Sequence, residues 1–228
     1  MKSLIFDSGP IISLTTNNLV WLLEELKRGY GGDFFIVEAV KRELIDRPLA
    51  TKKFKFEALQ VLKYINGGIL KIIESSKLKE ETIKLLDLAN NSFNAKGNWL
   101  RIVHYAEMSG LAACNKLNSD AFVVDERTTR LLVENPNRLV EILESTLHTD
   151  IKINDDNLEE FEKRTKNIKL IRSVELVTVA YEQGWLNKYL PNIPNAKKIL
   201  LDSVLWGVKL NGCAVSKREI DQIIKLEK

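Results

Sequence analysis

The chain has 228 residues, of which 45% are hydrophobic, 29% charged and only 7% aromatic. This length allows one large domain, or one domain with an appendage, and it is enough to bury a core without disulfides. The formal charge of +3 is too small to indicate a nucleic-acid-binding protein by itself. Residues 1–150 carry 20 basic and 20 acidic side chains, so the whole positive excess lies in the C-terminal third.

The composition also excludes several classes of protein and site. No 18 consecutive residues are apolar, which argues against a membrane-spanning helix, and the apolar run at 4–6 is too short for a signal peptide, so we expect a cytoplasmic protein. Cys114 and Cys213 are the only cysteines, and their small apolar neighbours predict core positions. With only His104 and His148 available, a histidine-rich zinc site is excluded. Any chemistry must rest mainly on carboxylates.

Short β-rich segments alternate with helical patterns over the first 150 residues. Strands are predicted at 2–6, 34–37, 69–73, 121–124 and 149–153. Helices are predicted between them at 11–27, 38–46, 52–65, 80–89, 99–117 and 126–134. Strands separated by helices indicate an α/β fold of three layers, with a mostly parallel sheet between two layers of helices.

The pattern changes after about residue 150, where only helices are expected. They are predicted at 158–165, 172–184 and 195–210, followed by a last helix opened by the capping-box spacing of Ser216 and Glu219. We therefore predict an α/β domain over residues 1–154 and an all-helical extension over residues 155–228 that packs on it. No low-complexity linker separates the two.

Two aspartates directly follow predicted strands. Asp7 comes after the first strand and Asp125 after the strand at 121–124. In a parallel sheet both would lie at the carboxyl edge, where open α/β sheets bind ligands. The alternative is that each only caps the helix that follows it.

Two glutamates are expected to face inward from helices. Position 107 falls within an apolar stripe of the helix predicted at 99–117, where an unpaired carboxylate is costly unless a cation faces it. The alternative is a salt bridge between Glu107 and Arg101 or Arg130. Glu43 lies one turn from Val40 on the inner side of its helix, and there the competing explanation is an ion pair with Arg47.

The four acids form a stronger argument together than singly. If Asp7, Glu43, Glu107 and Asp125 meet, their repulsion calls for divalent cations, and a site made of oxygen donors selects Mg²⁺ or Mn²⁺ over zinc. Such a site is suited to metal-assisted hydrolysis of phosphodiesters. We therefore predict these four residues as both metal ligands and catalytic residues.

The order and spacing of the acids resemble those of the PIN-domain nuclease family. The resemblance rests on the sequence segments Asp7-Ser8, Val40-x-x-Glu43-Leu44, Glu107-x-x-x-Leu111-Ala112 and Val123-Val124-Asp125-Glu126-x-x-x-Arg130. It covers residues 3–135 and a terminal strand near 149–153. It implies a Rossmann-like fold, a Mg²⁺- or Mn²⁺-dependent endoribonuclease acting on single-stranded RNA, and the four acids as metal ligands. Ser8, Glu126, Arg130 and Asp120 become accessory candidates, although Asp120 is better explained as a turn residue after Asn118-Ser119.

The C-terminal region is similar to the helical tail of larger archaeal PIN-type proteins. Its basic residues gather in one stretch, which either forms a solvated helix face or follows a phosphate backbone: Lys163, Arg164, Lys166, Lys169 and Arg172. Family members often form homodimers. The alternatives to an RNA-processing enzyme are a non-catalytic module that binds RNA or protein, and the toxin nuclease of a toxin–antitoxin pair, which the added helices make less fitting.

Overall fold

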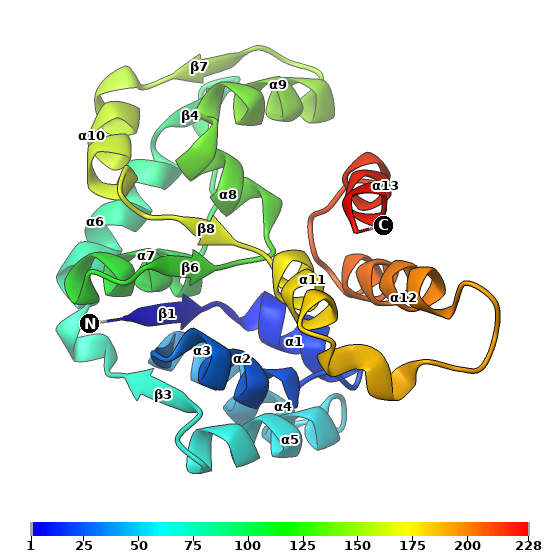
Figure 1. The fold of residues 1–228 in the computed structure, drawn as a ribbon. Coiled ribbons are helices and arrows are strands. Elements are labelled where there is room, and N and C mark those ends of the chain that lie inside the picture. The colour runs from blue at the N-terminus through cyan, green and yellow to red at the C-terminus, as the bar shows by residue number, and fades with distance from the viewer. Residues whose placement is uncertain (1, 228) are drawn as a thin grey trace.

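The computed structural model describes residues 2–227. Five parallel strands form the central sheet in the order β3-β2-β1-β6-β8 (Figure 1). Their bounds are β1 (Ser3–Phe6), β2 (Asp33–Val37), β3 (Leu70–Ile73), β6 (Ala121–Val123) and β8 (Leu170–Ile171). A second, antiparallel sheet has the order β5-β4-β7, with β4 (Phe93–Ala95), β5 (Asn98–Trp99) and β7 (Ile151–Ile153). The strand predicted at 149–153 is therefore an edge strand, but of this second sheet.

Helices connect the strands and cover both faces of the central sheet. In the first half of the chain they are α1 (Ser8–Thr16), α2 (Leu22–Tyr30), α3 (Glu38–Lys41), η1 (Arg42–Asp46), α4 (Arg47–Ala50), α5 (Lys55–Asn66), η2 (Ser75–Lys77), α6 (Lys79–Asn90) and α7 (Tyr105–Leu117). In the second half they are α8 (Arg127–Glu134), α9 (Pro136–Leu147), α10 (Asp155–Thr165), α11 (Ser173–Glu182), η3 (Trp185–Tyr189), α12 (Ala196–Leu210) and α13 (Lys217–Leu226). No helix among these described residues combines the length and the apolar composition needed to cross a bilayer.

Alternation of side chains along the strands decides which helix covers which face. Leu4 and Phe34 are register partners, and with α2 and α11 they line a groove on one face of the sheet. Phe122 pairs with Ile5, so its ring points to the other face, where α7 packs against it. A Cβ on Gly110 of α7 would stand 2.4 Å from that ring, so only glycine allows this close approach. The α/β class and the mostly parallel sheet are as predicted.

The C-terminal region is not entirely helical, which corrects one prediction. Leu170 and Ile171 form β8, which pairs in parallel with Phe122 and Val123 of β6 and becomes an edge of the central sheet. Two apolar residues between Lys169 and Arg172 are too short a run to give a strand signal from sequence. The sheet therefore crosses the boundary predicted at residue 154.

Two predicted helices have different bounds for identifiable reasons. The helix predicted at 11–27 divides into α1 and α2, because Asn18 adopts a left-handed conformation with φ of 57°. The helix predicted to begin at residue 99 begins at Tyr105. The Asn90 carboxamide holds the preceding segment extended: it accepts from the backbone N–H of Ile102 and Val103 (2.8 and 3.1 Å) and donates to the Val103 carbonyl (3.1 Å).

Candidate active site

Asp7 stands where β1 ends and α1 begins. Its backbone N–H donates to the Val123 carbonyl of β6 (2.9 Å), which fixes it at the carboxyl edge of the sheet. Its side chain is the N-cap of α1 and accepts a bond from the Gly9 N–H (3.4 Å). Only 6% of the residue is exposed. Asp7 therefore caps α1, as the alternative explanation predicted. Capping uses one oxygen of the Asp7 carboxylate, and the same residue also lines the pocket described below.

Glu43 lies on a π-helical turn, η1, inserted between α3 and α4. The Arg47 N–H bonds to the Arg42 carbonyl five residues back, and the helical path continues through Pro48 into α4, beyond the end predicted at residue 46. A wider turn relieves the clash of a proline ring with the carbonyl four residues earlier. The Glu43 carboxylate is half-buried and accepts a hydrogen bond from the Ser8 hydroxyl (2.9 Å).

Glu107 occupies the first turn of α7. Its carboxylate accepts a bond from the backbone N–H of His104, the N-cap residue of the same helix. This contact holds the half-buried carboxylate at the helix N-terminus, where the backbone N–H groups favour negative charge. The inward position predicted for residue 107 is thus reached by capping geometry, because residues 99–104 of the predicted helix, which carry part of its apolar stripe, lie outside α7.

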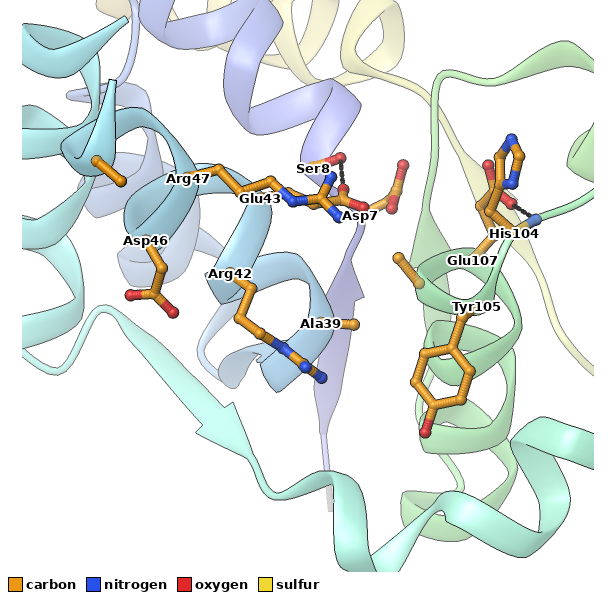
Figure 2. A pocket seen from close by; sticks show the side chains of 12 residues that line it. Asp7, Ser8, Ala39, Arg42, Glu43, Asp46, Arg47, His104, Tyr105 and Glu107 are labelled. Atoms are coloured by element: carbon orange, nitrogen blue, oxygen red, sulfur yellow. Dashed lines mark hydrogen bonds between the residues drawn. The ribbon is translucent and has the colours of Figure 1, made fainter. Parts of the chain in front are cut away.

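One pocket of about 960 Å³ brings these three acids together. The segment from α3 to α4 forms one wall, the N-terminus of α7 forms the other, and Asp7 with Ser8 lies between them (Figure 2). Lining residues beyond the predicted set include Arg42, Arg47, His104 and Tyr105. The sequence signal for the two arginines is their position on either side of Glu43. The same positions also fit a solvated Arg42 and an Arg47 that pairs with Glu43.

The pocket has an excess of negative charge. Burial, and then the neighbouring Glu43 and Asp125, raise the pKa of Asp7 from 3.8 to about 6, against the opposing effect of backbone N–H groups of Ser8 and Gly9. Burial also raises the pKa of Glu107 to about 7, with further increases from Asp7, Glu126 and Glu43. Within residues 2–227, no Lys, Arg or His side chain forms an ion pair with Asp7, Glu43 or Glu107. Among these residues, the salt bridges considered between Glu43 and Arg47 and between Glu107 and Arg101 or Arg130 are therefore absent.

Asp125 lies behind the pocket rather than in it. Its carboxylate is 2% exposed and accepts bonds from the Ser13 hydroxyl (3.0 Å) and from the backbone N–H and hydroxyl of Ser173 (both 2.7 Å). Asp125 is nevertheless close to the site. A Cβ added to Gly9 would lie 3.4 Å from the Cβ of Asp125 and 3.7 Å from a carboxylate oxygen of Asp7. Asp125 thus fastens the start of α11 to α1, and it does not line the pocket as the other three acids do.

The accessory candidates divide between the site and the scaffold. Ser8 is in the pocket, and Glu126 caps α8 through the Thr129 N–H (2.6 Å) while lying near enough to Glu107 to influence its pKa. Arg130 donates to the Ala214 carbonyl (3.2 Å) and pairs with Glu134 (3.3 Å). Asp120 precedes β6, at the opposite edge of the sheet from Asp7, and accepts a bond from the Tyr30 hydroxyl.

The basic stretch of the C-terminal region does not form one free surface. Arg164 bonds Glu81 and Glu160 (both 2.8 Å), and Lys163 lies 3.8 Å from Glu159. Arg172 is largely buried and bonds Glu175, Glu219 and the Ala214 carbonyl, so it ties α11 to α13. Lys166 and Lys169 are exposed, but Lys169 directly precedes β8, at the edge of the sheet away from Asp7.

The donor set suits a hard divalent cation. All three acids offer carboxylate oxygens, which Mg²⁺ and Mn²⁺ prefer. Within residues 2–227 no group of three Asp, Glu, His or Cys side chains is arranged so that it could hold a metal ion. Mg²⁺ commonly keeps several waters and takes one or two carboxylates, so the pocket fits an ion held by part of this set.

Comparisons of the chain with protein-family models, with curated proteins and with solved structures found no match.

Proposed function

We propose that this protein is a Mg²⁺- or Mn²⁺-dependent endoribonuclease of the PIN-domain type that cleaves single-stranded RNA. The observation that carries the proposal is the meeting of Asp7, Glu43 and Glu107 in one pocket, where no side chain of residues 2–227 forms an ion pair with any of them. These acids come from three separate elements, and burial of such charge is costly to the fold unless a ligand compensates for it. The sequence order of the acids, which resembles that of the family, agrees with this function.

The sheet topology supports the proposal independently. The chain passes from β1 to β2 and β3 on one side and later returns to place β6 on the other side of β1. The crevice at the carboxyl ends of β1 and β6 is the topological switch point, where open α/β sheets bind their ligands. Asp7 follows β1 at this crevice, and the pocket opens beside it.

Each pocket residue has a definite part in this proposal. Asp7 with Glu43 or Glu107 would hold the ion, which would supply an activated water and neutralise charge on the phosphodiester. The Ser8 hydroxyl orients Glu43, and the His104 N–H orients Glu107. Arg42 and Arg47 line the same pocket and can contact substrate phosphates. Asp125 acts as a positioning residue, because it secures α1, whose N-terminus carries Asp7 and Ser8.

A cleavage assay tests this function. A labelled single-stranded RNA is incubated with the protein and Mn²⁺, with EDTA, and with the variant Asp7→Asn, which keeps an N-cap side chain at α1. We expect cleavage only by the wild type with metal, and unchanged cleavage by the control Asp120→Asn at the opposite edge of the sheet. Equal cleavage by the wild type and Asp7→Asn would overturn the proposal. RNA binding without cleavage at saturating Mn²⁺ would favour a non-catalytic binding module.

A further inference from the structure

A short exposed segment beside the pocket alternates lysine with phenylalanine. Residues 51–56 read Thr-Lys-Lys-Phe-Lys-Phe, and all six are exposed. Phe54 is 48% exposed and Phe56 is 70% exposed, values unusual for side chains that gain free energy by burial. We call this segment the Lys/Phe segment.

The lysines of this segment are free to meet an external anion. Within residues 2–227, no acidic side chain pairs with Lys52, Lys53 or Lys55. The Lys53 ammonium lies over an aromatic face, with its Nζ 4.7 Å from the centre of the Phe54 ring. This differs from the basic stretch of the C-terminal region, where both arginines are held in ion pairs.

The Lys/Phe segment continues the wall of the candidate active site. Arg47 and Ala50 of α4 line the pocket, and the segment begins at the next residue. Glu43, which lines the pocket, also lines a second, small cavity of about 90 Å³ together with Phe54. A chain of nucleotides with a phosphate near Glu43 would therefore meet Arg47 and then the lysines and phenylalanines of the segment.

The backbone fixes how the segment presents its side chains. Phe54 has φ of 59°, a left-handed conformation that is rare for a bulky residue, and it forms the N-cap position of α5. The Thr51 hydroxyl donates to the carbonyls of Pro48 and Lys53 (both 3.2 Å), which closes the turn between α4 and α5. The segment is thus an ordered turn with its apolar rings outside the core.

We propose that the Lys/Phe segment, together with Arg42 and Arg47, is the surface that holds single-stranded RNA for the active site; this inference rests on the proposed ribonuclease function. Free cations follow the phosphate backbone, and Phe54 and Phe56 stack on unpaired bases, the combination by which proteins hold single strands. Double-stranded RNA keeps its bases stacked and would not offer them to these rings.

The first test measures binding without cleavage. Anisotropy of a labelled single-stranded RNA is recorded in EDTA at several salt concentrations for the wild type and for two triple variants of equal charge change. One is Lys52→Glu/Lys53→Glu/Lys55→Glu, and the matched control is Lys163→Glu/Lys166→Glu/Lys169→Glu in the C-terminal region. We expect the first to weaken binding at least about tenfold and to lower the salt slope by about 2, at about 0.7 per lost phosphate contact, with little change for the control.

The second test separates stacking from general apolar contact. Phe56→Leu keeps an apolar side chain without an aromatic face, whereas Phe56→Trp keeps the face. Since stacking of one base contributes on the order of tenfold or more in affinity, we expect Leu to weaken binding about tenfold and Trp to restore it. Thermal unfolding of each variant verifies that this exposed position leaves the fold intact.

The possible results distinguish this surface from the proposed function. Equal losses in the two triple variants, or equal affinity of the Leu and Trp variants, would overturn the surface assignment. Tight binding of double-stranded RNA or of anionic lipid vesicles by the segment, with no binding of single strands, would also overturn it. If the segment binds single-stranded RNA as expected but no cleavage occurs with Mn²⁺, the surface stands and the nuclease proposal fails. If the first triple variant binds and cleaves RNA as the wild type does, the nuclease proposal stands and the surface assignment fails.

Discussion

The Asp125 carboxylate and Ser173 are joined by two hydrogen bonds of 2.7 Å, one from the backbone N–H and one from the hydroxyl. Because Ser173 is the first residue of α11, Asp125 caps a helix 48 positions away rather than the helix that follows it. The Cys213 thiol lies against the same group, and burial followed by the charge of Asp125 raises the pKa of this thiol to about 12. The residue predicted as the fourth metal ligand thus holds the C-terminal region to the strands that carry the site.

This contact predicts a loss of stability on removing one hydroxyl. Ser173→Ala leaves the buried Asp125 without one of its donors, which we expect to lower the free energy of unfolding by about 1–3 kcal/mol. Urea denaturation measures the change. The control Ser203→Ala removes an exposed hydroxyl that donates to the Ile199 carbonyl of its own helix, so it should cost less than about 0.5 kcal/mol. Equal effects of the two variants would contradict the role given to Ser173.

A truncation tests whether residues 1–154 are an independent domain. Removing residues 155–228 deletes β8, exposes the edge of β6 and removes Ser173, one of the hydrogen-bond partners of Asp125. It also removes buried core side chains, including Phe161, Val174 and Val177. We expect the 1–154 fragment to lack cooperative urea unfolding and to aggregate, since an open apolar sheet edge promotes association. A fragment that unfolds cooperatively would show that the C-terminal region is dispensable to the fold.

Asp7→Asn should stabilise the metal-free protein at high pH. The pKa of Asp7 rises from 3.8 to about 6 on folding. The contribution of its carboxyl group to the free energy of unfolding is therefore complete below about pH 4 and is lost as the pH rises through 6. Asparagine does not titrate, so the stability of the variant relative to the wild type should grow by about 2–3 kcal/mol between pH 4 and pH 8 in EDTA. Urea titrations at each pH measure it, with Asp150→Asn as the exposed control. A difference that stays constant with pH would contradict the burial of an unbalanced charge at Asp7.

Divalent metal should stabilise the protein more as the pH rises. Protons compete with metal for Asp7 and Glu107, whose pKa values of about 6 and about 7 leave them largely protonated at pH 5.5 and largely ionised at pH 8. We expect Mn²⁺ to raise the Tm clearly at pH 8 and little at pH 5.5, because a ligand stabilises only the state that it binds. The double variant Asp7→Asn/Glu107→Gln should lose this increase. An equal increase at both pH values would place the metal elsewhere.

The sequence predicts what local patterns determine. Four of the five strands of the central sheet, the position of Asp7 at a strand end and the α/β class follow from apolar runs and their punctuation. The π turn that carries Glu43 and the late start of α7 at Tyr105 depend on hydrogen bonds between distant residues, such as those of Asn90, and no local period reports them. The helix α9 is missing from the prediction, since Asn135-Pro136 reads as a helix stop, although proline is also favoured in a first helical turn.

The candidate site, like the fold, can be predicted from sequence only where local patterns position its residues. Strand ends and helix positions favour the gathering of Asp7, Glu43 and Glu107, which the pocket brings together. The different place of Asp125 could not be predicted, because it depends on Ser13 and Ser173, two residues that resemble any other serine in the sequence. The Lys/Phe segment overlaps a predicted helix, and the exposure of Phe54 and Phe56 is a property of the folded surface alone.

The most direct test of the central claim is an anomalous difference map from crystals soaked in Mn²⁺ at pH 8. The account predicts a peak in the pocket, within bonding distance of Asp7 and of Glu43 or Glu107, and no such peak in Asp7→Asn crystals. An empty pocket at saturating Mn²⁺ would contradict the account.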